Sequence, residues 1–187
     1  MAKKDDNLPN SPMPILDACV LINLLATGRL EDVAKALGTP FLICDVVRAE
    51  TLFLRNPNDP ETPKDPIDLS PFLRDGILEE TTTRSEDEEA AFVAFATQLD
   101  DGEAMTLAIA LSRDLTLATD ERKARKVFLD AGGHADRLIS TPQILQQWSQ
   151  AASIEITPFL TLIETRARYR PRHTDPLYKW WTAERGK

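Results

Sequence analysis

The stretch PILDACVLINLLATGRL (residues 14–30) sets an acid between a short apolar strand and an apolar helix. The residues PIL predict a buried strand that ends at Asp17, and the apolar run after it predicts a helix over 18–26 that Gly28 closes. Asp17 can cap this helix, yet it also stands beside a hydrophobic core, where a carboxylate loses hydration. A structural cap and a charge-compensated site are both compatible with this position.

The same alternation of apolar strands and helices continues along the chain. Strands are predicted at 41–44, 77–83, 115–119 and 137–140, and helices at 30–37, 46–54, 85–99, 103–113, 121–131, 141–152 and 158–168. This order indicates an α/β fold with a largely parallel sheet, whose binding crevice lies beyond the carboxyl ends of the strands. Asp17 and Asp120 each follow a strand, so they are expected to meet at one rim.

The remainder of the chain is organised around this single domain. We expect a flexible polar lead over 1–12, the domain over 13–152, and a helical extension with a basic, aromatic tail over 153–187. Residues 56–71 carry five prolines among Asp and Thr, which predicts a stiff surface insertion without ladder hydrogen bonds.

Composition narrows the function classes. The 187 residues are 42% hydrophobic, which suits one soluble core, and the formal charge of −8 argues against indiscriminate nucleic-acid binding by a basic surface. Arginine and lysine gather between 166 and 187, where they allow a local basic contact surface. No apolar stretch approaches the roughly 20 residues that span a bilayer, so we expect no membrane contact and a cytoplasmic location.

The cysteines and histidines do not indicate a zinc site. Cys19 and Cys44 lie in apolar runs and are expected to be small buried side chains and not a disulfide. His134 and His173 do not complete a zinc-type spacing with them.

Three further acids lie on apolar helix faces or at strand ends. Glu50 has apolar residues three and four positions away on both sides, so a solvated surface does not explain it. Glu103 starts a helix that is apolar nearly all round, where it either complements the helix terminus or joins a site. Asp120 has capping as its alternative, and Asp45 is explained by capping alone. With Asp17, these acids repel one another unless a cation or protons compensate them, which favours a divalent metal site.

Three segments carry a family resemblance. The sequences PILDACVLINLLATGRL, ICDVVRAE and LDDGEAMTLAIALSRDLTLATDERKARKVF resemble the successive motifs of the PIN domain, especially of its prokaryotic members, over about residues 14–139. The resemblance implies a three-layer α/β/α domain and an acidic quartet of Asp17, Glu50, Glu103 and Asp120. It also implies metal-dependent RNA cleavage, as in bacterial toxin–antitoxin ribonucleases, with an antitoxin protein as partner.

The chain departs from the family pattern next to the first acid. Ala18 and Cys19 stand where the family usually has a hydroxyl residue, and Asn23 one helical turn later can replace that hydrogen-bond partner. Two neighbouring acids, Asp101 and Glu121, compete with quartet members for a place in the site.

The expected reaction is hydrolysis of phosphodiester bonds in single-stranded RNA. It needs a deprotonated water and stabilisation of charge on phosphate oxygens, which Mg²⁺ or Mn²⁺ on oxygen ligands supplies. Asp17 and Asp120 are predicted as principal ligands, with Glu50 and Glu103 completing the shell directly or through water. One alternative is a catalytically weak PIN-like RNA-binding or regulatory module, which Ala18 suggests. A third is an Mg-dependent phosphotransfer enzyme, but Asp17-Ala18-Cys19 lacks the second Asp that this chemistry needs.

Substrate and partner contacts are predicted from the basic and aromatic residues. The helix after Asp120 opens with Arg122, Lys123, Arg125 and Lys126, which either reach phosphates or form a solvated face. In the tail, aromatic residues interleaved with arginines suit stacking on bases, while Trp180 and Trp181 suit packing on the core or on a partner. The helices at 141–152 and 158–168 are expected to form a homodimer face or to grip an antitoxin.

Overall fold

A five-stranded parallel sheet forms the centre of the computed structural model, which describes residues 13–50, 52–59 and 61–186. The predicted lead over 1–12 lies outside the described residues. In space the strands run in the order β5 (Leu78–Thr81), β2 (Phe41–Cys44), β1 (Pro14–Leu16), β6 (Thr116–Ala118) and β7 (Leu138–Ile139). The prediction of an α/β fold with a parallel sheet is confirmed.

Strand β1 occupies the middle of the sheet and marks the point where the chain changes direction. It pairs with β2 on one side, Ile15 opposite Leu42, and with β6 on the other, Ile15 opposite Leu117. The strands after β1 extend first toward β5 and then, from β6, toward β7. The carboxyl ends of β1 and β6 therefore form the crevice at which open α/β sheets bind ligands.

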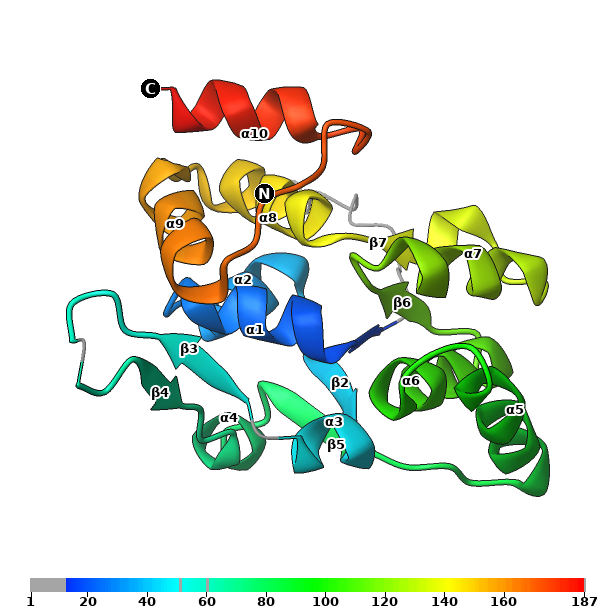
Figure 1. Cartoon of the computed structure of the whole chain (residues 1–187). Coiled ribbons are helices and arrows are strands. Elements are labelled where there is room, and N and C mark those ends of the chain that lie inside the picture. The colour runs from blue at the N-terminus through cyan, green and yellow to red at the C-terminus, as the bar shows by residue number, and fades with distance from the viewer. Residues whose placement is uncertain (1–12, 51, 60, 187) are drawn as a thin grey trace, which may run out of the picture.

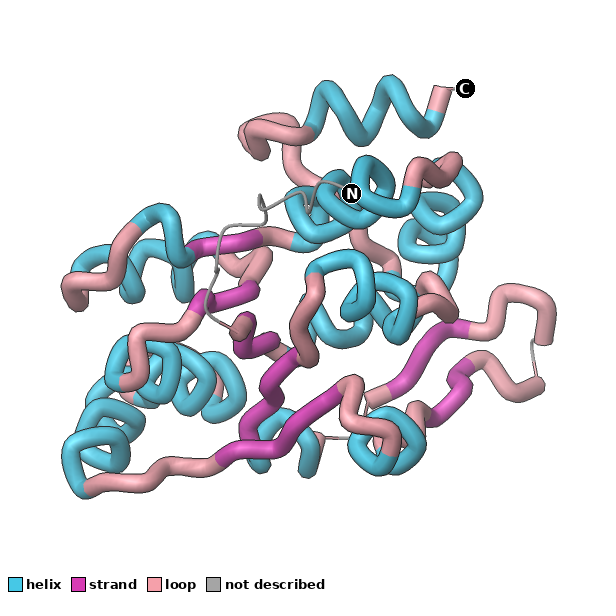
Figure 2. The backbone as a smooth tube through the Cα atoms, turned by 180° about the vertical axis from the view of Figure 1, so that it is seen from behind, coloured by secondary structure: helices cyan, strands magenta, loops and turns pink. Residues whose placement is uncertain are grey.

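Helices cover both faces of this sheet and give a three-layer arrangement (Figure 1). One layer contains α1 (Ala18–Ala26), α2 (Leu30–Leu37), α8 (Thr141–Ala152) and α9 (Thr157–Leu162). The other contains α3 (Asp45–Ala49), α5 (Glu86–Ala96), α6 (Asp101–Ser112) and α7 (Arg122–Asp130). The view from behind shows the same two groups of helices on either side of the strands (Figure 2).

The sheet shares one hydrophobic core with helices α1 and α6. Ile15, Leu16 and Ile43 are fully buried, and α6 buries Ala104, Leu107 and their neighbours because its residues are apolar nearly all round. Removal of this apolar surface from water is the main stabilising contribution to such a fold. The rim of the sheet thus stands on rigid, fully packed elements.

The structure corrects the region after β2. The helix predicted over 46–54 ends at Ala49, and the residues after it form β3 (Phe53–Arg55), which pairs antiparallel with β4 (Lys64–Pro66). The insertion over 56–71 therefore does contain ladder hydrogen bonds, followed by α4 (Ser70–Arg74). An isolated two-stranded ribbon tolerates proline because each strand has an unpaired edge.

Three expected local features also differ. The cap of α3 is Cys44, whose Sγ accepts from the Val47 amide, and not Asp45. Ser140 and not Thr141 caps α8 in a capping box with Gln143. Cys44 is buried as predicted, but Cys19 is exposed.

The C-terminal residues pack onto the helical layer. Helix α9 continues into a π-helical segment, η2 (Ile163–Ala167), and the chain returns as α10 (Tyr178–Arg185) across α9. Trp181 is fully buried in the common core and Trp180 packs against it, which confirms core packing for this pair. The division of the chain at 152/153 stays a prediction. None of the helices in the described ranges is long and apolar enough to cross a membrane.

Candidate metal centre

Asp17 lies directly after β1 and caps α1. Its backbone amide donates to the Ala118 carbonyl at 3.1 Å, so the pairing of β1 with β6 fixes it beside the residues that follow β6. Its Oδ1 accepts from the Val20 amide at 2.7 Å, which confirms the predicted cap. The residue is only 2% exposed.

The second oxygen of Asp17 is the unusual feature of this rim. Oδ2 is buried and makes no hydrogen bond within the described part of the chain. Burial raises the pKa of Asp17 to about 8, and the charges of Asp120 and Glu103 add to the rise, although Thr119 and the Val20 amide oppose it. A buried carboxylate oxygen without a donor is costly unless a proton or a cation compensates it.

Asp120 follows β6 and is held by four donors. Oδ1 accepts from the Thr141 amide at 2.9 Å and from the Tyr169 hydroxyl at 3.1 Å. Oδ2 accepts from Asn23 Nδ2 at 3.0 Å and from Thr141 Oγ1 at 2.6 Å. Burial raises the pKa of Asp120, and these donors lower it. A carboxylate offers about four lone-pair positions, so the donors occupy its full capacity.

These contacts replace the capping role that was the alternative for Asp120. Helix α7 has Glu121 at its N-cap without a side-chain capping bond, whereas Asp120 fastens the start of α8 and the segment after η2 to the rim. Asn23 is buried and lies at the site, as its position one turn after Cys19 suggested. No sequence pattern indicated Thr141 or Tyr169 as partners of Asp120, because both lie far from it along the chain.

Glu103 faces the same rim from the first turn of α6. Asp100 caps this helix by accepting from the Glu103 amide at 2.8 Å. Burial raises the pKa of Glu103, and the nearby carboxylates of Asp100 and Glu121 raise it further. Glu103 is half-buried, whereas the competing Asp101 is exposed.

Glu50 reaches the start of α6 from the other side. It ends α3, and its Oε1 lies against Gly102, where a Cβ atom would come within 2.3 Å of that oxygen. Glu50 is exposed, contrary to the expectation from its apolar neighbours in sequence, and partial desolvation of its carboxylate and the charge of Asp100 raise its pKa. The missing side chain at Gly102 is what permits this close approach next to Glu103.

The acids thus converge on one rim without forming a closed ligand set. Cys19 is exposed, but its thiol loses part of its hydration at the rim. This loss, with the charges of four of these acids, raises its pKa to about 12: Asp17, Glu121, Asp120 and Glu103. Within residues 13–50, 52–59 and 61–186, however, no three Asp, Glu, His or Cys side chains already surround one ion position. Glu50 interacts with Asp100 and is the most peripheral of the predicted quartet.

The donor set fits a hard divalent cation. All its members are carboxylates, which Mg²⁺ and Mn²⁺ prefer, and Oδ2 of Asp17 is a buried oxygen that accepts no hydrogen bond within the described residues, with the Thr119 side chain as the nearby polar group. Glu103 and Glu121 are half-buried, so their side chains retain the freedom to turn toward Asp17. We found no signal in the sequence that distinguishes Glu121 from Asp120, and in the structure both line the same cavity.

The basic residues that follow Asp120 differ in whether they line the cavity or lie on the exposed face of α7. Arg125 donates to the Thr119 carbonyl at 3.1 Å, and Arg122 lines the cavity beside Asp120. Lys123 donates to the Gln98 carbonyl and Lys126 pairs with Asp130 on the exposed face of α7. The two arginines therefore line the cavity, whereas the charge of Lys123 acts on Glu103, whose pKa it lowers.

Comparison with known families gives one match. A family model described as a PIN domain matches residues 13–134. Comparisons with curated proteins and with solved structures returned no match.

Proposed function

The chain belongs to the PIN domain family, and from this we propose that it is an Mg²⁺- or Mn²⁺-dependent endoribonuclease that hydrolyses single-stranded RNA. PIN domains are generally nucleases that use divalent metals. The observation that carries the proposal is the buried, unpaired Oδ2 of Asp17 at the switch point of the sheet, with further carboxylates around it. A nuclease of this class needs such an oxygen to hold its ion.

The residues have separate tasks in this proposal. Asp17 would hold the ion together with Glu103. Asp120 would reach it through a water molecule or after releasing one of its four donors, and Glu50 would complete the shell from its position beside the start of α6. An ion bound there would supply a nucleophile at neutral pH and would stabilise negative charge on the phosphate. Asn23 and Thr141 fix the orientation of the Asp120 carboxylate through their hydrogen bonds. Such orientation by surrounding donors tunes a metal ligand.

An RNA cleavage assay tests the activity directly. Wild type and Asp17→Asn are compared on a panel of labelled single-stranded RNAs, with EDTA and with added Mg²⁺ or Mn²⁺. Asp45→Asn is the matched control, because Asp45 lies in α3 and its Oδ1 only accepts from its neighbour's amide. We expect metal-dependent cleavage by wild type and Asp45→Asn, and a loss of at least about 100-fold in Asp17→Asn. Equal cleavage by wild type and Asp17→Asn contradicts the assignment.

A catalytically weak RNA-binding module is the second candidate. It is favoured by the four donors that occupy Asp120 and by Ala18 in place of a hydroxyl residue. RNA binding and metal binding without cleavage in the same assay would select it.

We further propose that the protein is a toxin that has an antitoxin partner and forms a homodimer. The family resemblance supports an RNA-cleaving toxin with an antitoxin and a homodimeric state. Induced expression in a bacterial host is then expected to arrest growth for wild type and not for Asp17→Asn, and light scattering is expected to give twice the chain mass. Normal growth with soluble wild-type protein argues against the toxin role, and a monomeric mass argues against the dimer.

A further inference from the structure

A cavity of about 780 Å³ adjoins the acidic rim on the side of Asp120. Its walls come from α1, the start of α7, α8 and residues 167–177. The last two of these walls, α8 and residues 167–177, lie outside residues 13–134, which match the family model. The cavity is therefore partly built by the part of the chain that follows the family match.

The charge in this cavity is opposite to that of the whole chain. The chain carries −8, yet the cavity is lined by five arginines against three acids: Arg122, Arg125, Arg168, Arg170 and Arg172, with Asp120, Glu121 and Asp175. Asp120 is already occupied by four hydrogen-bond donors. The cavity thus offers an excess of guanidinium groups.

Two arginines of the C-terminal wall have side chains without a hydrogen-bond or ion-pair partner among the described residues. Arg168 and Arg172 are exposed, and their side chains make no hydrogen bond or ion pair with any part of the chain that the structure describes. Arg168 also adopts a left-handed backbone conformation with a φ of 61°, which is uncommon for a residue other than glycine. Such strain persists only where the surrounding structure imposes it.

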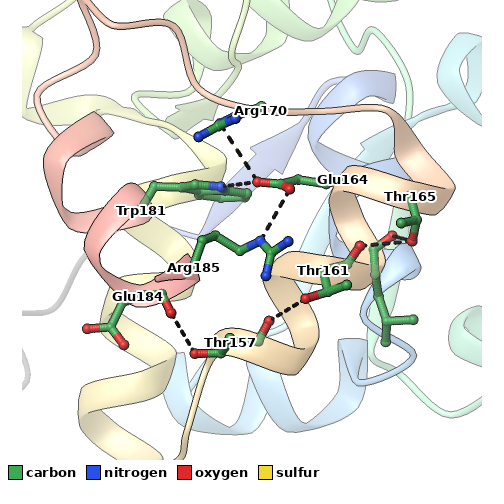
Figure 3. Close-up of polar contacts among 9 residues, drawn as sticks. Thr157, Thr161, Glu164, Thr165, Arg170, Trp181, Glu184 and Arg185 are labelled. Carbon is green, nitrogen blue, oxygen red and sulfur yellow. Dashed lines mark hydrogen bonds and ion pairs between the residues drawn. The ribbon is translucent and has the colours of Figure 1, made fainter. Parts of the chain in front are cut away.

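Glu164 holds the wall in place (Figure 3). It accepts from Trp181 Nε1 at 2.8 Å, and its carboxylate pairs with Arg185 at 3.2 Å and with Arg170 at 3.9 Å. The ring of Tyr169 packs edge-on against Trp181, with centroids 5.8 Å apart, while its hydroxyl donates to Asp120. The segment that carries Arg168 and Arg172 is therefore fixed at both the core and the acidic rim.

We infer that this cavity binds the phosphodiester backbone of single-stranded RNA, with Arg168 and Arg172 of the C-terminal wall contacting phosphates. The inference rests on the proposed function, whose substrate-binding residues it names. Guanidinium groups donate in pairs to phosphate oxygens, and a cavity of this volume admits nucleotide-sized ligands and not a duplex. A strand bound there passes directly beside Asp120 and Glu121.

The test measures RNA binding separately from cleavage. A short fluorescent single-stranded RNA is titrated with the full chain carrying Asp17→Asn, in EDTA, and anisotropy is followed at several salt concentrations. Arg168→Gln/Arg172→Gln is compared with Arg29→Gln/Arg74→Gln, which removes the same charge from exposed arginines outside the cavity. Arg168→Lys/Arg172→Lys keeps the charge without the paired donors, and circular dichroism confirms folding of each protein.

The expected result is an affinity loss of about tenfold or more for Arg168→Gln/Arg172→Gln, with a salt slope smaller by about 1.4. The control pair is expected to stay within about twofold of the parent, and the lysine pair to lie between them. Equal losses in the cavity pair and the control pair, or no loss in either, would overturn the inference.

The two proposals fail separately. Wild-type protein that binds RNA through Arg168 and Arg172 but never cleaves it leaves the cavity assignment standing and removes the nuclease. Cleavage with an unchanged KM in Arg168→Gln/Arg172→Gln leaves the nuclease standing and removes the cavity as its RNA-binding site.

Discussion

The hydroxyl of Tyr169 donates to Oδ1 of Asp120 at 3.1 Å, across 49 positions of sequence. This bond joins the C-terminal segment to the strand end that carries the acidic rim. The bond therefore connects the two features on which the proposals rest. These are the carboxylates after β1 and β6, and the arginine-lined cavity beside them.

Removing this hydroxyl is expected to destabilise the protein modestly. Tyr169→Phe keeps the ring against Trp181 but takes one donor from a charged acceptor, a change worth about 1–2 kcal/mol. Urea denaturation above pH 8 measures the loss. Tyr178→Phe is the control, since its hydroxyl makes no hydrogen bond within the described ranges. Equal stability of Tyr169→Phe and wild type would show that the bond contributes nothing in solution.

The raised pKa of Asp17 predicts how stability without metal depends on pH. The folded protein keeps a proton on Asp17 up to about pH 8, whereas the unfolded chain releases it near 3.8. The free energy of unfolding is therefore highest, as far as Asp17 is concerned, below about pH 4. It falls as the pH rises to 8, by an amount on the order of a few kcal/mol.

Asp17→Asn tests this linkage because it cannot ionise. In EDTA the variant is expected to be more stable than wild type at pH 8 and to lose the slope between pH 4 and 8. Asp45→Asn should retain the wild-type slope. Denaturation curves at several pH values measure the dependence of the free energy of unfolding on pH. If this dependence is the same in Asp17→Asn as in wild type, the raised pKa does not belong to Asp17.

Gly102 separates the contribution of Glu50 from the stability of the fold. A methyl group at position 102 would meet Glu50 Oε1 at 2.3 Å, so Gly102→Ala is expected to push that flexible side chain away from the rim. The same change raises helix propensity in α6 by up to about 1 kcal/mol. Mn²⁺ affinity by calorimetry should fall about as much as in Glu50→Gln, with thermal stability equal or higher. Unchanged affinity in both variants would remove Glu50 from the site.

Glu164 is expected to control the order of the C-terminal helix. Glu164→Ala removes the acceptor of Trp181 Nε1 and both ion pairs, so amide exchange in α10 should accelerate about tenfold or more while β1 and β6 keep their protection. The control Glu155→Ala changes an exposed residue and should leave exchange in α10 unaltered. Equal protection of α10 in wild type and Glu164→Ala would deny Glu164 this role.

Much of the fold could be predicted because the signals are local. The apolar runs PIL and FLIC, each followed by a helix, are sufficient to place β1, β2 and the carboxyl end at which Asp17 lies. The helix after β2 was predicted too long because Phe53 and Leu54 suit either structure, and only their pairing with Pro66 and Asp65 makes them a strand. That pairing is a tertiary choice that periodicity does not report.

The positions of the candidate acids in the fold were predictable, whereas their surroundings were not. The positions of Asp17, Glu103 and Asp120 follow from strand ends and a helix start, whose geometry is general. The Tyr169 and Thr141 contacts and the cavity arginines depend on how the C-terminal segment folds back, which no short-range pattern encodes.

The central claim is that the acids around Asp17 hold one hard cation, and diffraction from Mn²⁺-soaked crystals at the manganese edge tests it most directly. We predict an anomalous peak about 2.1 Å from Oδ2 of Asp17 that also touches Glu103, Asp120 or Glu121, and that vanishes in Asp17→Asn. Manganese bound only elsewhere on the molecule, with Oδ2 of Asp17 left uncoordinated above pH 8, would contradict it.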